Sequence, residues 1–150
     1  VPARDLYLAK LILAAGVSFL AQAAIGVLFV IAGKLAGIDA PIPPELPGWL
    51  FFGGLGGVAV CALQLYLSLV IRAFAIPVAI ALVGGIAGLM LTSQGLGYAF
   101  PYSLLCLGMR ANNPQMALPL PSFLAGCGFY LLLFSLLAVR RLSRRDAVTG

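Results

Sequence analysis

Long apolar runs alternate with short polar or proline-rich stretches along the chain. Four of these runs are long enough to cross a bilayer: residues 6–35, 49–71, 76–91 (beginning at 74 if Phe74 is included) and 120–139. An α-helix needs about 20 mainly apolar residues to cross the hydrocarbon core of a membrane. The pattern therefore predicts an all-α fold, a polytopic bundle of about four transmembrane helices.

Prolines and charges mark the connections between the predicted helices. Four prolines lie between Asp39 and Gly48, so this stretch cannot continue a helix and should form an extended loop outside the hydrocarbon. Only a few residues around Arg72 separate the second and third runs, which predicts a tight hairpin. Pro77 then falls in the first turn of the third helix, where its missing N–H costs little.

A further apolar segment, residues 98–109, is too short to cross a bilayer. It contains an aromatic–proline motif formed by Tyr98, Phe100, Pro101 and Tyr102. An apolar stretch of about 12 residues is typical of a re-entrant or interfacial helix. Non-helical backbone at membrane depth must be covered by protein or water. We therefore expect a short outer helix in addition to the four spans.

The basic residues lie at the ends of the apolar runs and predict the orientation in the membrane. The chain has nine Lys and Arg residues and four Asp and Glu residues, a net charge of +5. If the N-terminus is cytoplasmic, only Lys34 and Arg110 are outside, and seven basic residues are inside: Arg4, Lys10, Arg72, Arg140, Arg141, Arg144 and Arg145. The positive-inside rule favours this arrangement. We predict a multi-pass membrane protein with both termini cytoplasmic and with no nucleic-acid partner.

The composition argues against an enzyme. Hydrophobic residues make up 63% of the chain and charged residues 9%, whereas charged residues are about a quarter of a soluble domain. There is no histidine, the three cysteines are far apart, and no predicted span contains a carboxylate in its middle. We therefore predict no catalytic, metal-binding or cofactor-binding residues. The absence of a mid-membrane carboxylate also counts against an ion-coupled carrier.

Small residues recur at helical spacing in two of the predicted spans. Gly53 and Gly57 in the second, and Gly84 and Gly88 in the third, have the four-residue spacing that lets helices approach closely in lipid. Packing within the chain is the simpler interpretation of these pairs. A moving interface or a dimer seam is the alternative.

A few polar residues inside the spans are candidates for a substrate path. Gln22 and Gln64 are the most costly to expose to lipid, so each should face a neighbouring helix or a cavity. A hydrogen bond between helices explains them most simply, and a lining for a transported substrate is the alternative. Arg110 similarly has two interpretations, a solvated charge at the interface or a contact to an anionic lipid or substrate.

The order of these pieces resembles the permease of an ABC exporter of the type-two class, more narrowly the family linked to lantibiotic immunity and peptide-antibiotic export. The resemblance rests on residues 2–10 (PARDLYLAK), 63–72 (LQLYLSLVIR), 76–88 (IPVAIALVGGIAG) and 98–103 (YAFPYS). It covers most of the chain, without a single diagnostic signature. Tyr102 is a mild departure, because tryptophan is expected after the proline.

The resemblance implies a six-span permease of which residues 1–150 form the last four spans as a single transmembrane domain. We also expect a longer protein because the chain opens on Val1 without an initiator methionine. Such a permease would export a peptide antibiotic or another amphipathic substrate and would contribute to antibiotic resistance. The chain has no P-loop motif, so a separate ATP-binding subunit is implied, together with a second permease chain. The alternative function is a non-transport membrane scaffold or assembly protein.

Overall fold

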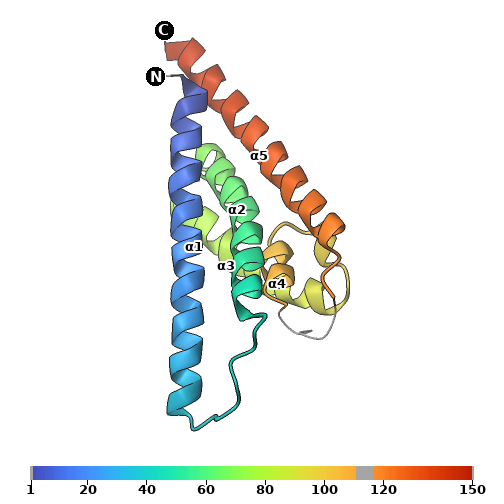
Figure 1. The fold of residues 1–150 in the computed structure, drawn as a ribbon. Coiled ribbons are helices and arrows are strands. Elements are labelled where there is room, and N and C mark those ends of the chain that lie inside the picture. The colour runs from blue at the N-terminus through green and yellow to red at the C-terminus, as the bar shows by residue number, and fades with distance from the viewer. Residues whose placement is uncertain (1, 111–116, 150) are drawn as a thin grey trace.

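The computed structural model describes residues 2–110 and 117–149, with the side chains of 145–149 excepted. Within these ranges the chain is mainly helical and has no strand. Among the described residues, four helices are long and apolar enough to cross a membrane: α1 (Ala3–Leu35), α2 (Leu46–Val70), α3 (Ala75–Ser93) and the Leu120–Arg144 part of α5 (Leu120–Thr149). The predicted all-α polytopic bundle is confirmed (Figure 1).

Helix α2 lies at the centre of the bundle and contacts α1, α5 and the short helix α4 (Ser103–Gly108). In its most apolar stretch 39% of the residues are buried inside the protein, against 11–17% in the other three spans. Its buried residues are mostly glycine and alanine. Because these side chains are small, three neighbouring elements can approach one helix closely.

The chain ends of the bundle lie together. Figure 1 shows the N-terminus of α1 beside the C-terminus of α5. The Tyr7 hydroxyl of α1 lies 3.0 Å from the Ser135 hydroxyl of α5, and Tyr7 is only 2% exposed. Four membrane spans would place both ends of the described chain on one side of a membrane, which agrees with the sequence prediction. Helix α5 continues into the basic residues that were expected to form only a tail.

Prolines and glycines lie at the ends of the helices, and one helix begins earlier than the sequence predicted. The proline-rich loop was expected to reach Gly48, but α2 already begins at Leu46. Pro47 fits there because a proline in the first helical turn loses no hydrogen bond. Gly37 and Gly95 follow the C-terminal ends of α1 and α3 and have φ of 74° and 77°. The backbone hydrogen bonds around them are typical of a Schellman motif, which ends a helix.

The aromatic–proline segment is divided in two, whereas the sequence predicted one short helix over residues 98–109. It forms a 3-10 turn, η1 (Gly97–Ala99), and then α4. Phe100 between them is extended, with φ −131° and ψ 123°. The residue before a proline is held out of the helical region by the proline ring, so Pro101 separates the two pieces. Residues 97–108 are called the 97–108 segment below.

Candidate functional site

The glycine face of α2 holds the 97–108 segment against the bundle. A Cβ added at Gly56 would lie 2.5 Å from the Leu104 carbonyl oxygen of α4. One added at Gly53 would collide with the Met109 side chain, and one at Gly57 would lie 2.5 Å from the Ser18 hydroxyl of α1. The predicted pair Gly53 and Gly57 therefore lies where α2 is in contact with both α1 and the residues around α4.

The glycine pair of α3 faces the same segment from the other side. A Cβ at Gly84 would lie 2.7 Å from the Tyr102 ring, and one at Gly88 would lie 2.9 Å from the Ser103 backbone nitrogen. By contrast, α2 and α3 make few direct contacts with each other. The glycines of both spans thus leave room for the 97–108 segment, which lies between the two helices.

Tyr102 connects this segment to α2 by a hydrogen bond. The Gln64 amide nitrogen donates to the Tyr102 hydroxyl at 2.6 Å. Tyr102 is 7% exposed, and its ring lies 5.5 Å from the Phe100 ring, centroid to centroid. Three of the sequence candidates, Gln64, Tyr102 and Gly84, are therefore in one cluster, and Phe100 and Pro101 lie beside it in the chain.

Gln22 lies elsewhere, at the contact between α1 and α2. Its side chain is 4% exposed and its amide lies next to Gly53, eleven residues before Gln64 on α2, which is about 16 Å along the helix. Its Oε1 atom is buried and has no hydrogen-bond partner among the described residues. Gln22 and Gln64, which the sequence suggested together as candidates for a substrate path, therefore lie at separate places in the structure.

Several buried residues at this site were not among those predicted from the sequence. Leu104 and Phe123 are fully buried and form a core cluster with Ala59 and Cys127. The Ser103 hydroxyl is buried and, within the part of the chain that the structure describes, has no hydrogen-bond partner. Gly56 was visible in the sequence as part of a glycine-rich run, but spacing alone did not distinguish it from its neighbours.

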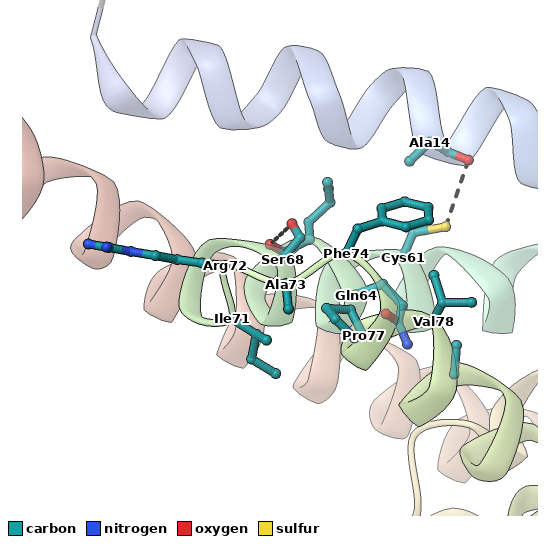
Figure 2. Close-up of a pocket in the computed structure, with 12 residues that line it drawn as sticks. Ala14, Cys61, Gln64, Ser68, Ile71, Arg72, Ala73, Phe74, Pro77 and Val78 are labelled. Atoms are coloured by element: carbon teal, nitrogen blue, oxygen red, sulfur yellow. Dashed lines mark hydrogen bonds between the residues drawn. The ribbon is translucent and has the colours of Figure 1, made fainter.

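A pocket of about 540 Å³ lies between α1, α2 and the start of α3 (Figure 2). Gln64 and Cys61 line it, together with the α2–α3 connection around Arg72 and Phe74. Gln22 is not among its lining residues. The walls are mainly apolar, so the pocket suits a hydrophobic group and offers no cluster of polar groups for catalysis.

Another hollow of about 590 Å³ lies where the proline-rich loop meets α2, lined by Glu45, Trp49 and Arg110 among others. Arg110 has a left-handed backbone with φ 55°. Burial raises the pKa of the nearby Tyr98 phenol, and the positive charge of Arg110 partly lowers it.

Among the described residues, no group of three or more His, Cys, Asp or Glu side chains could hold a metal ion.

Replacing Tyr102 with phenylalanine should lower the free energy of unfolding by about 1 kcal/mol. The change leaves the Gln64 amide without its acceptor, and hydrogen bonds between membrane helices are worth about this much. Reversible unfolding in mixed micelles measures it. A double-mutant cycle with Gln64→Leu is the control: if the two effects simply add, the bond contributes nothing and the interpretation is wrong.

The first three helices match a known family. A model of the family described as ABC-2 family transporter protein matches residues 1–88, which is more than half of the chain. The match covers α1, α2 and α3 as far as Gly88, whereas the 97–108 segment and α5 lie beyond it. No curated protein and no solved structure matches the chain.

Proposed function

This chain belongs to the ABC-2 transporter family, and from that premise we propose that it is a permease subunit that exports a peptide antibiotic or another amphipathic substrate. The family match over residues 1–88 is the observation that carries the proposal. The four apolar helices are those of an integral multi-pass membrane protein, as a permease requires.

Membership in this family implies a partnership with an ATP-binding subunit. The chain contains no P-loop of its own, so ATP hydrolysis would occur on that subunit. We propose that the working unit contains two permease chains and that both termini are cytoplasmic in a bacterial inner membrane. The basic residues at the end of the bundle where the termini meet support this orientation.

Purification from native membranes in mild detergent tests the function. The expected result is a stoichiometric ATPase that co-purifies with the tagged chain, with hydrolysis stimulated by an amphipathic peptide. A complete preparation without an ATPase would overturn the permease proposal and favour the scaffold alternative. Thiol labelling of single cysteines placed at residues 5 and 40 tests the orientation separately, since they should react from opposite sides of the membrane.

We place the substrate path along the contact of α1 and α2 at Gln22. Gln64 already donates its amide to Tyr102, whereas the buried Oε1 of Gln22 lacks a partner among the described residues. An unsatisfied buried oxygen costs stability, and a polar substrate group crossing this seam could bond to it. Gln22 is therefore a stronger candidate than Gln64 for contact with a transported molecule.

Replacing Gln22 with leucine should raise the free energy of unfolding by about 1 kcal/mol and reduce substrate-stimulated ATP hydrolysis severalfold. The stability gain follows because leucine has a similar size and leaves no buried polar atom unpaired. Micelle unfolding and ATPase assays of the purified complex measure the two effects. Gln64→Leu is the matched control and should lower stability. Unchanged substrate stimulation in Gln22→Leu would remove Gln22 from the path.

A further inference from the structure

The pocket between α1, α2 and α3 has an apolar body and a basic end. Its volume of about 540 Å³ falls within the range of about 300–1,000 Å³ that is common for ligand pockets. Figure 2 shows Arg72 extending from the α2–α3 connection, away from Cys61 and Gln64 at the other end of the pocket. Aliphatic and aromatic side chains such as Leu65 and Phe74 supply much of the wall between them.

Three of the four polar side chains of the wall, all but Arg72, each make a hydrogen bond to the protein. The Cys61 thiol lies 3.7 Å from the Ala14 carbonyl, Gln64 donates to Tyr102, and the Ser68 hydroxyl donates to the Leu65 carbonyl at 2.7 Å. A peptide backbone buried here would leave most of its own N–H and C=O groups without partners, at a cost of several kcal/mol for each group. A hydrocarbon chain has no such groups, so it fits this wall better than a peptide does.

Arg72 adds a positively charged group to a wall that is otherwise mainly apolar. Its side chain is exposed in the α2–α3 connection. This connection lies toward the end of the bundle that also carries Arg4, Lys10 and the first arginines of the basic tail. A guanidinium group binds phosphate through paired hydrogen bonds. An occupant with an apolar tail and an anionic phosphate at one end therefore complements the pocket over its whole length.

We propose that this pocket holds one acyl chain of an anionic phospholipid whose phosphate is bound by Arg72. The bound lipid would pack against α1, α2 and α3, and would fill the space where α2 and α3 diverge. This inference does not depend on the proposed transport substrate, because the lipid serves as a fixed part of the bundle.

Native mass spectrometry of the purified chain tests the proposal with phosphatidylglycerol and phosphatidylcholine of identical acyl chains. We expect the wild-type chain to retain one phosphatidylglycerol in preference to phosphatidylcholine. Arg72→Gln should weaken that binding about fivefold, which is the contribution of one basic residue near an anionic surface. Arg72→Lys should keep most of the preference. Arg141→Gln is the matched control, because Arg141 is exposed on α5 and lies outside the pocket.

Alkylation of Cys61 gives a second readout of the acyl chain. Phosphatidylglycerol should protect Cys61 from maleimide, and glycerol phosphate alone should not, while the half-buried Cys106 outside the pocket reports general changes. Equal losses in Arg72→Gln and Arg141→Gln would overturn the proposal, as would equal binding of the two lipids. Protection of Cys61 by an amphipathic peptide and not by lipid would also overturn it and would assign the pocket to a transported substrate.

Discussion

Replacing Gly56 with leucine is expected to lower the free energy of unfolding by about 3 kcal/mol or more. The backbone of α4 occupies the space beside this glycine, because an added Cβ would lie 2.5 Å from the Leu104 carbonyl oxygen and 2.7 Å from the Leu105 nitrogen. A backbone cannot move aside as a flexible side chain can, so the helices must separate. Forcing extra carbon atoms into a packed interior typically costs about 1–3 kcal/mol, and more where the surroundings are rigid.

Gly85→Leu is the matched control for this prediction. Gly85 lies on α3, is exposed on the surface of the bundle and has nothing within 4 Å of an added Cβ. Leucine there gains helix propensity and meets lipid, so stability should stay the same or rise. Reversible unfolding in mixed micelles compares the two variants. Equal stability of Gly56→Leu and Gly85→Leu would contradict the close contact of α2 with α4.

Replacing Phe123 with alanine is expected to lower the free energy of unfolding by about 3 kcal/mol. Phe123 of α5 is fully buried in the core cluster with Leu104, and its ring meets the Phe52 ring edge-to-face with centroids 6.0 Å apart. Removing it leaves a cavity between α2, α4 and α5. Replacement of a buried phenylalanine by alanine typically costs about 3–5 kcal/mol, and the lower value is expected here because lipid is as apolar as the protein core.

Phe129→Ala on the same helix is the matched control, because it removes an equally hydrophobic ring that is not packed in the core. Phe129 is 60% exposed on the surface of the bundle, so its ring contacts lipid in a membrane and its loss should change stability by less than about 1 kcal/mol. Both variants are measured in the same micelle assay. If Phe129→Ala destabilises the chain as much as Phe123→Ala does, the two rings contribute similarly and the described core is wrong.

The four spans could be predicted from sequence because each is encoded locally. A run of about 20 apolar residues has one stable state in a bilayer, and the prolines and glycines between the runs mark where helices end. Pro77 illustrates this, since it lies in the first turn of a helix in the structure as well. Most helix limits shifted by only a few residues, such as the start of α2 at Leu46, whereas α5 continues through the basic tail to Thr149.

The partners of the predicted residues could not be predicted, because they come from distant parts of the chain. Glycine spacing shows that something approaches closely, but it does not say what. In the structure Gly84 and Gly88 face Tyr102 and Ser103 of the 97–108 segment. Similarly, hydropathy indicated that Gln22 and Gln64 need partners, and only the packed structure shows that Gln64 bonds to Tyr102 while Gln22 lies against Gly53.

The position of the 97–108 segment between α2 and α3 has a consequence for biosynthesis. Both helices leave the ribosome before the residues that fill the space between them, since Ser103 and Leu104 follow the end of α3 in the chain. The nascent hairpin therefore enters the membrane with its glycine faces uncovered and can complete its packing only after later residues return to it. We expect chains that stop after Ser93 to be removed by membrane quality-control proteases, whereas chains that reach Met109 gain protection in a pulse-chase experiment.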